Sequence, residues 1–339
     1  NAQAYAKQVQ DYSAKRQMIA VFEHGAGMCL NGKNPSEIMS SVTGELGKIG
    51  VADKSDLHTY NSRQLTENVL NAIEMASNGV RPFKFDINDL DSLLWVANKD
   101  LLIVGGRPGT GKTVLLMTGI ANNKSKRGML FEMETGNEQA GIRILSQLSG
   151  VPAYRMQRGQ LTEQDYDPVY RMADELSSWN LVVCDLPAMR LSQIRQRARK
   201  ENAKKKLDYI MVDYLQLGHG DSKTDNRARE IGELAQGLKE LAKELNVPVI
   251  CAAQINRGSE MVSEKRPALH NLKESGDIEQ AADSVVFVHI NDSGGRTLIV
   301  AKQRMGKLGD VDVYFNEGIM RFESANVQNV NTKDWTNKD

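Results

Sequence analysis

The spacing of apolar positions changes along the chain, and the change marks its organisation. From residue 101 onward, short apolar runs are separated by longer stretches with helical spacing. The apolar runs predict buried strands at 101–104, 129–133, 181–184, 209–212, 247–252 and 284–289. The helical candidates include 137–148, 191–200 and 229–245. Strands that alternate with helices predict right-handed crossovers and a mainly parallel sheet buried on both faces.

The C-terminal part has a different pattern. Three short apolar runs, at 297–301, 311–315 and 320–322, are separated by turns that contain glycine. This spacing predicts that the sheet finishes with antiparallel strands. The last residues, 325–339, are mostly polar and predict a frayed tail.

The first fifty residues predict a helical hairpin. Its turn is expected at 25–32, and its second helix opens at Pro35, where the missing N–H costs little. The chain begins at Asn1 within a helical pattern, so we expect further residues upstream. A hairpin of this size is too small for a stable core, so it needs another surface to pack on.

A polar linker at 51–61 leads to one more short helix. Its apolar stripe includes Leu65, Val69 and Ile73, and it stops at 78–79. An isolated helix of this length is marginal in water, so the stripe needs a partner surface. That partner is either the chain's own core or a neighbouring subunit.

The strand at 101–104 leads into a glycine-rich segment with the spacing of a phosphate-binding loop. The segment fits G-x-x-x-x-G-K-[ST] and consists of Gly106, Arg107, Pro108, Gly109, Thr110, Gly111, Lys112 and Thr113. Its glycines let backbone N–H groups turn toward an anion, and the next helix adds the positive end of its dipole. The lysine can reach the β- and γ-phosphates, and the threonine hydroxyl can ligate Mg²⁺. With a strand before it and a helix after it, the motif predicts a nucleotide site rather than a turn with a surface lysine.

Acidic residues at the ends of two predicted strands can complete such a site. Asp213 follows the run 209–212, where an acid can hold Mg²⁺ or its water; the alternative is a helix cap. Glu132 and Glu134 are two residues apart, so an extended backbone puts them on one face. Periodicity does not choose between them as the group that activates water. Glu134 is favoured because it lies nearer the edge where the strands' carboxyl ends face the nucleotide.

Other segments stay ambiguous in their local sequence. Gln254 follows a predicted strand, where it is either a γ-phosphate sensor or an ordinary polar strand end. The segment 272–280 is typical of a loop that approaches a phosphate, and equally of a solvated turn. Lys302 and Arg304 lie two apart on a predicted hairpin and are either surface charges or cations presented across a subunit boundary. The basic cluster at 195–206 lacks interleaved aromatic residues, which favours a solvated helix face over a DNA-binding surface.

Composition excludes some classes of protein. Lys plus Arg number 43 and Asp plus Glu also number 43, so no global field draws the chain to nucleic acid or to a membrane. The three cysteines are far apart and form no C-x-x-C pair, which argues against a zinc site and favours a reducing, cytoplasmic compartment. No apolar run approaches the roughly 18 residues that span a bilayer.

Five blocks of the sequence together resemble the DnaB-type replicative DNA helicases, ring-forming relatives of the RecA fold. In the family's order they are GGRPGTGKT from Gly105, FEMETGNEQAGIR from Phe131, YIMVDYLQL from Tyr209, VPVICAAQINR from Val247 with LKESGDIEQAADSVVF from Leu272, and AKQRMGKLGDV from Ala301. The resemblance covers about residues 80–324. It implies an α/β fold, namely a RecA-like P-loop NTPase core with a mainly parallel central sheet, preceded by a small α-helical segment and a linker helix. The expected domains are a partial helical N-terminal domain (1–62), a linker with a docking helix (63–91), the RecA-like ATPase domain (92–324) and a polar tail (325–339).

The resemblance also implies roles for residues that match the family's motifs. Lys112 and Thr113 resemble the phosphate and Mg²⁺ contacts, and Asp213 resembles the second acid on the metal side. Glu134 falls at the family's catalytic glutamate. The remaining matches are Arg143 as a phosphate contact, Gln254 as the γ-phosphate sensor, Lys302 and Arg304 as cations donated to the neighbour's nucleotide, and Lys273, Glu274 and Gly276 in the loop that touches single-stranded DNA.

The implied activity is ATP-driven translocation on single-stranded DNA by a homo-hexameric ring that unwinds duplex DNA at the replication fork. Its cofactors are ATP and Mg²⁺, and its partners include a helicase loader and a primase. The sequence departs from the family at 83–86, where a Thr-Gly segment is replaced by Phe-Lys-Phe-Asp. Two other classes remain alternatives: a RecA-like recombination or repair ATPase, and a non-motor ATP-dependent ring assembly protein.

Overall fold

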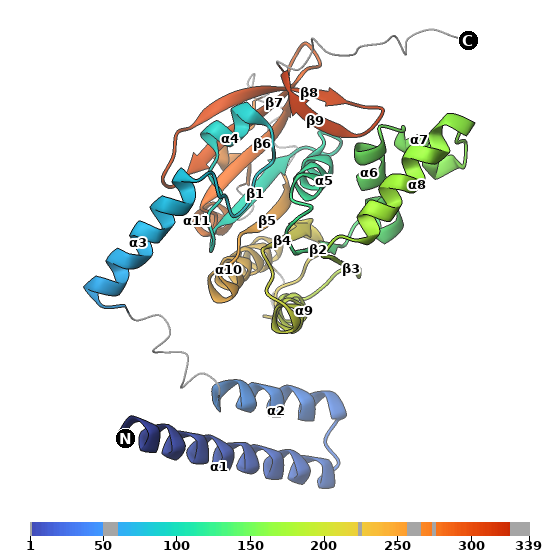
Figure 1. Cartoon of the computed structure of the whole chain (residues 1–339). Coiled ribbons are helices and arrows are strands. Elements are labelled where there is room, and N and C mark those ends of the chain that lie inside the picture. The colour runs from blue at the N-terminus through green and yellow to red at the C-terminus, as the bar shows by residue number, and fades with distance from the viewer. Residues whose placement is uncertain (1, 50–59, 223–225, 256–265, 273–275, 326–339) are drawn as a thin grey trace. The chain divides into compact units, whose positions relative to one another are not determined.

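A computed structural model describes residues 2–49, 60–222, 226–255, 266–272 and 276–325 of the chain (Figure 1). It divides the chain into two compact units, Asn1–Gly79 and Val80–Asp339. The first unit is helical, and the second contains the sheet. Among the described residues, no helix is long and apolar enough to cross a membrane.

The first unit opens with two helices that pack against each other, α1 (Ala2–Leu30) and α2 (Pro35–Ile49). The turn expected at 25–32 is wrong in its first part, because α1 continues to Leu30. The physical reason is close packing: a Cβ atom on Gly25 would lie 2.7 Å from Cγ2 of Val42 on α2. This glycine therefore permits the two helices to approach, and the chain turns only after Leu30, where Gly32 has a φ of 68°.

The predicted short helix is confirmed as α3 (Ser62–Ser77). The side chain of Asn61 accepts a hydrogen bond from the N–H of Gln64, and the Gln64 side chain accepts one from the N–H of Asn61. This reciprocal cap fixes the start of the helix. None of the residues of α3 is buried.

Nine strands of the second unit form one sheet in the order β3-β2-β4-β5-β1-β6-β7-β8-β9. Pairing is parallel from β3 to β6 and antiparallel from β6 to β9. The strands are β1 (Leu101–Gly106), β2 (Gly128–Glu132), β3 (Leu181–Asp185), β4 (Tyr209–Asp213), β5 (Val249–Gln254), β6 (Ser284–Ile290), β7 (Arg296–Gln303), β8 (Gly309–Asn316) and β9 (Arg321–Ser324). The structure thus confirms both the parallel core and the antiparallel finish.

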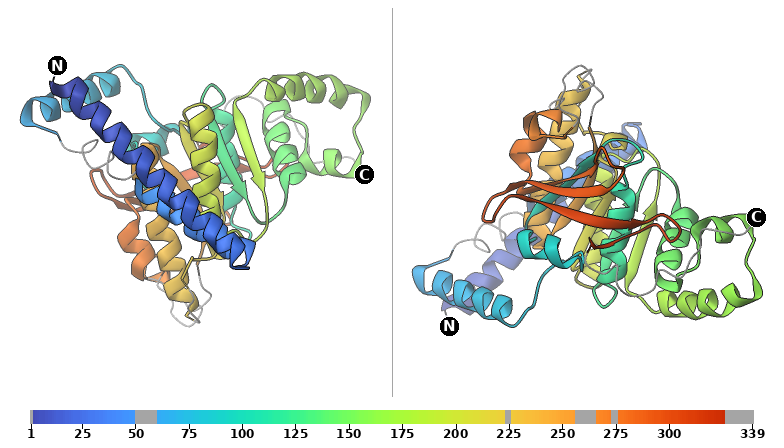
Figure 2. Two further views of the ribbon diagram at one scale, coloured as in Figure 1. Left: turned by 90° about the horizontal axis from the view of Figure 1, so that it is seen from below. Right: turned by 90° about the horizontal axis from the view of Figure 1, so that it is seen from above.

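Helices lie on both faces of the sheet (Figure 2). The described helices of this unit are α4 (Asn88–Leu93), α5 (Lys112–Asn122), α6 (Asn137–Ser149), α7 (Ala153–Arg158), α8 (Glu163–Ser177), α9 (Leu191–Lys204), α10 (Arg227–Leu245) and α11 (Gly276–Ala281), with short 3-10 turns at Leu215–Leu217 and Leu269–Leu272. Of these, α7 and α8 pack on α6, and α11 packs on α10. Alternate residues of β1 join two separate cores. Leu101 and Ile103 pack with α9 and α10, whereas Leu102 and Val104 pack with α5. The fully apolar β1 is therefore buried on both faces, as a central parallel strand requires.

The basic cluster on α9 makes ion pairs with α10. Arg195 lies 2.5 Å from a carboxylate oxygen of Glu240, and Arg199 makes two hydrogen bonds of 2.8 Å to Glu244. These pairs tie the two helices together on one side of the sheet. Part of the charge that could attract a polyanion is therefore already paired within the chain.

Candidate nucleotide-binding site

The glycine-rich segment leaves the carboxyl end of β1 and enters α5, which begins at Lys112. Gly109 and Gly111 have φ values of 75° and 106°, in the left-handed region that favours glycine. A Cβ atom on Gly111 would also lie 2.9 Å from the ring of Phe322. Position 111 therefore requires glycine for two reasons: its backbone is left-handed, and a side chain there would meet the ring of Phe322.

Lys112 lies partly buried inside this loop. Its Nζ atom donates a 2.8 Å hydrogen bond to the carbonyl oxygen of Arg107. Burial lowers the pKa of Lys112, and the carboxylates of Asp213 and then Glu134 oppose that shift. The ammonium group is thus placed between the loop's backbone and two acids.

Asp213 ends β4 and is 1% exposed. Within the described part of the chain, neither of its carboxylate oxygens has a hydrogen-bond partner of ordinary geometry. Burial, followed by the Glu132 carboxylate, raises the pKa of Asp213 to about 7, and the Thr113 hydroxyl opposes the rise. A buried carboxylate beside a hydroxyl is an oxygen donor set of the kind that Mg²⁺ prefers. These residues therefore fit a divalent cation.

A pocket of about 480 Å³ opens beside the loop. It is lined by Pro108, Gly109, Gly111, Lys112, Thr113, Val114, Glu134, Thr135, Arg143, Tyr214, Gln254, Arg296, Phe315, Glu317 and Met320. The structure thus brings Glu134, Arg143 and Gln254 to the glycine-rich loop, from the loop after β2, from α6 and from β5 respectively. Arg143 donates a 3.0 Å hydrogen bond to the hydroxyl of Thr135, which fixes its direction. Of the two glutamates that periodicity could not separate, Glu134 is exposed and lines the pocket, whereas Glu132 is buried.

Several residues at this pocket were missed by sequence reasoning. Gln216 holds the backbone of Gln254 on both sides: its amide donates to the Gln254 carbonyl at 2.8 Å, and its oxygen accepts the Gln254 N–H at 2.9 Å. Arg296 lies over the ring of Phe315, 5.1 Å from its centre. Arg296 and Phe315 come from β7 and β8, so only the long-range pairing of those strands brings them to the loop. No local motif could have found them.

Lys302 and Arg304 lie near the amino-terminal end of β1, whereas the pocket lies near its carboxyl end. Arg304 is 3.3 Å from a carboxylate oxygen of Asp283, and its backbone N–H donates to the Asp283 carbonyl. Asp283 also accepts the N–H of Leu101, the first residue of β1. The phosphate-binding loop follows the last residue of β1, and a strand of this length extends roughly 17 Å. The two cations are therefore far from the nucleotide pocket of their own chain.

Lys302 and Arg304 both reach α11. Lys302 donates through Nζ to the carbonyl of Glu279, and Arg304 lies 3.5 Å from the carbonyl of Gln280. Gly276 is the first residue of this helix. Lys273 and Glu274, the other predicted DNA contacts, lie outside the described residues.

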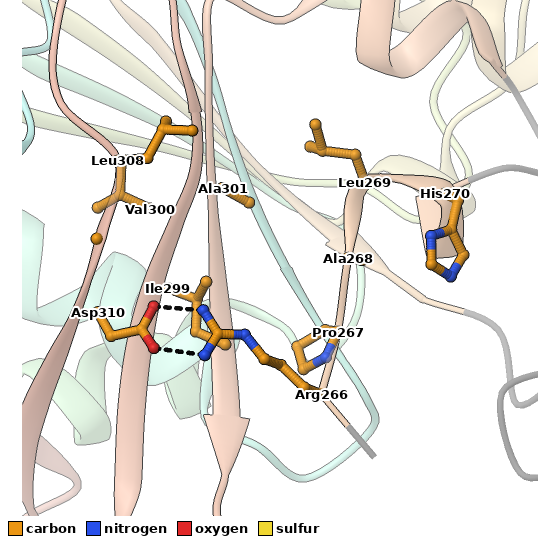
Figure 3. Close-up of a pocket in the computed structure, with 11 residues that line it drawn as sticks. Arg266, Pro267, Ala268, Leu269, His270, Ile299, Val300, Ala301, Leu308 and Asp310 are labelled. Atoms are coloured by element: carbon orange, nitrogen blue, oxygen red, sulfur yellow. Dashed lines mark hydrogen bonds and ion pairs between the residues drawn. The ribbon is translucent and has the colours of Figure 1, made fainter. Parts of the chain in front are cut away.

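A second hollow, of about 600 Å³, lies beside β7 and β8 (Figure 3). Its two facing charges, Arg266 and Asp310, pair with each other through two hydrogen bonds of 2.6 Å. Much of the remaining lining is apolar and includes Leu269, Ile299 and Leu308. None of the predicted site residues lies in it.

A phosphate-binding loop between β1 and α5, an acid at the end of β4 and a glutamate after β2 define a nucleotide-binding protein with a RecA-like fold. Residues 83–324 match the family model described as "DnaB-like helicase C terminal domain". The chain belongs to this family.

Two bacterial proteins are similar in sequence to most of the chain. It is 32% identical to "Replicative DNA helicase DnaB" of Rickettsia bellii (strain RML369-C), over 94% of this chain and 74% of the relative. It is 36% identical to "Replicative DNA helicase DnaC" of Bacillus subtilis (strain 168), over 66% of this chain and 52% of the relative.

Two solved structures, each 24% identical in sequence, share the fold. "The Structure Of A DnaB-Like Replicative Helicase And Its Interactions With Primase" has a TM-score of 0.77, over 95% of this chain and 78% of that chain. The other structure is an isolated ATPase domain, and it has a TM-score of 0.71, over 78% of this chain and 99% of that chain.

Proposed function

We propose that this chain is the motor subunit of an ATP-dependent replicative DNA helicase. The observation that carries the proposal is the pocket in which Lys112, Glu134 and Gln254 meet, in a chain that belongs to the DnaB-like family. The motor binds ATP, hydrolyses it and couples the reaction to movement along single-stranded DNA. Unwinding of the duplex at the fork follows from that movement.

Each side chain in the pocket has a role in hydrolysis. Lys112 and the N–H groups of the loop bind the phosphates, and Thr113 and Asp213 hold Mg²⁺, which offsets phosphate charge when bound. Glu134 accepts a proton from the attacking water and orients it. Arg143 contacts phosphate oxygens, and Gln254 senses the γ-phosphate from the end of β5.

The pocket is completed by a second subunit. Lys302 and Arg304 are too far from the nucleotide of their own chain, and a cation at the γ-phosphate stabilises the charge that develops in the transition state. We assign these two residues to the neighbour's nucleotide in a homo-hexameric ring. The apolar stripe of α3 would then have its partner on an adjacent subunit. We expect single-stranded DNA to contact Lys273, Glu274 and Gly276, and a primase and a helicase loader to bind the assembled ring.

Asp213→Asn tests the metal site. We expect the Mg²⁺ concentration for half-maximal ATP hydrolysis to rise on the order of 10–100-fold, as when a group that holds a metal or its water is lost. Because the folded-state pKa of Asp213 is raised from 3.8 to about 7, the metal-free protein loses stability as pH rises between these values, and the whole cost is present at pH 8. Asparagine removes this cost, so the melting temperature at pH 8 without Mg²⁺ should not fall. The control is Asp167→Asn on the exposed part of α8, and an unchanged Mg²⁺ requirement would contradict the assignment.

The helicase activity is tested by two assays on the same preparation. ATP hydrolysis is measured with and without single-stranded DNA, and strand displacement is measured on a forked duplex. Particle mass with an ATP analogue and single-stranded DNA shows whether a ring has formed. An assembled ring that neither unwinds the fork nor responds to DNA would rule out the motor, and an open filament would favour a recombination ATPase.

A further inference from the structure

The carboxylate of Glu132 is buried beneath the loop that carries Glu134. Glu132 is the last residue of β2 and is 0% exposed. In the sheet its backbone lies between Asp185 of β3 and Asp213 of β4. Burying a carboxylate in such a position costs free energy unless its oxygens accept hydrogen bonds.

One oxygen of Glu132 organises the next two residues of the loop. Its Oε1 atom accepts hydrogen bonds from the backbone N–H of Glu134 at 3.1 Å and of Thr135 at 3.0 Å. Thr135 in turn accepts the hydrogen bond that directs Arg143. Glu132 therefore holds the backbone on which Glu134 and the partner of Arg143 both depend.

The position of Glu132 does not suit direct contact with the attacking water. It is absent from the lining of the nucleotide pocket, whereas Glu134 is exposed there. Burial raises the pKa of Glu132, and the N–H groups of Thr135 and Glu134 oppose the rise. These donors favour an acceptor at this position, and a side-chain amide oxygen can serve as that acceptor as well.

We propose that Glu132 is a positioning residue for ATP hydrolysis, whose buried carboxylate holds the β2–α6 loop so that Glu134 faces the nucleotide. The role rests on the proposed ATPase function of the pocket. Loss of the acceptor lets the loop move, and a misplacement of about 1 Å in a catalytic group can lower kcat about 100-fold. Binding of ATP depends chiefly on the separate loop at 106–113, so it should change little.

The experiment compares Glu132→Gln, which keeps an acceptor oxygen without the charge, with Glu132→Leu, which has neither. Glu134→Gln provides the inactive reference, and Glu138→Gln and Glu138→Leu on the exposed first turn of α6 are matched controls. Steady-state ATP hydrolysis by the full chain is measured with single-stranded DNA. Binding of a fluorescent ATP analogue and the melting temperature are measured alongside it.

We expect Glu132→Leu to lose about 100-fold in kcat with KM and analogue binding within about threefold, and Glu132→Gln to recover kcat to within about fivefold of wild type. A Glu132→Gln variant as inactive as Glu134→Gln would overturn the role, because Glu132 would then carry the proton. Wild-type kcat in Glu132→Leu, or parallel loss of kcat, analogue binding and melting temperature in both variants, would overturn it as well. A wild-type protein that does not hydrolyse ATP would overturn the proposed function and this role together, whereas the other outcomes leave that function standing.

Discussion

Replacing Lys112 by alanine should abolish ATP hydrolysis, with a loss in kcat on the order of 10³-fold, the upper end for removing one donor to a developing charge. The ammonium group lies inside the phosphate-binding loop, where burial already lowers its pKa and two acids oppose the shift. In the proposed mechanism this charge binds the phosphates, so its loss should affect turnover directly. Steady-state release of phosphate with single-stranded DNA present measures the effect.

The matched control for Lys112 is Lys124→Ala. Lys124 follows α5 and pairs with Glu175 on the exposed side of α8, outside the nucleotide pocket. Removing this pair should cost well under about 1 kcal/mol of stability and leave turnover as it is. Turnover that survives in Lys112→Ala would remove the loop from the mechanism.

Arg304→Ala should leave nucleotide binding within about threefold while kcat falls on the order of 10³-fold or more, the range for a cation supplied to the transferring phosphoryl group. Its own chain holds Arg304 beside Asp283 at the edge of the sheet away from the pocket. We therefore expect the loss to arise at a neighbour's nucleotide, as proposed above. Lys307→Ala, which removes an exposed cation from the same hairpin, is the control.

Mixing two inactive variants tests the shared site directly. Arg304→Ala keeps Glu134, and Glu134→Ala keeps Arg304, so an interface that takes one group from each subunit is intact. A random equal mixture should contain about one quarter such interfaces and recover activity in proportion. Failure to recover any activity, in mixed assemblies that still form, would mean that Arg304 does not act across the boundary.

The centre of the sheet could be predicted from sequence because β1, β2 and β4 are buried along their whole length. Continuous apolar runs such as 101–104 have no solvent face, and each is bounded by turn residues or by a helix with clear periodicity. Four described helices, α4, α7, α8 and α11, were missing from the prediction, and α11 lies where a loop or a solvated turn was expected. In α8 a proline, Pro168, lies within the helix, and a proline inside such a run argues against a helix although the apolar positions keep helical spacing.

The site was predictable where chemistry is local in sequence. Asp213 and Gln254 each end a strand, Lys112 begins the helix that follows β1, and parallel strands bring their carboxyl ends to one edge. The wall formed by Arg296 and Phe315 was not predictable, because it depends on the register between β7 and β8. Spacing also left Glu132 and Glu134 equivalent, whereas burial separates them, and burial is a property of the folded chain.

β1 connects two unlike ends of the subunit, with the phosphate-binding loop after Gly106 and the Asp283–Arg304 pair beside Leu101. If one end of each subunit meets the other end of the next, contacts are head-to-tail, and n subunits complete n sites when closed but n−1 in an open arc. A monomer completes none, and a dimer with a single contact completes one. The rate of ATP turnover per subunit then depends on closure. It rises as subunits are added to the arc, and it reaches its maximum when the two free ends meet and the ring closes.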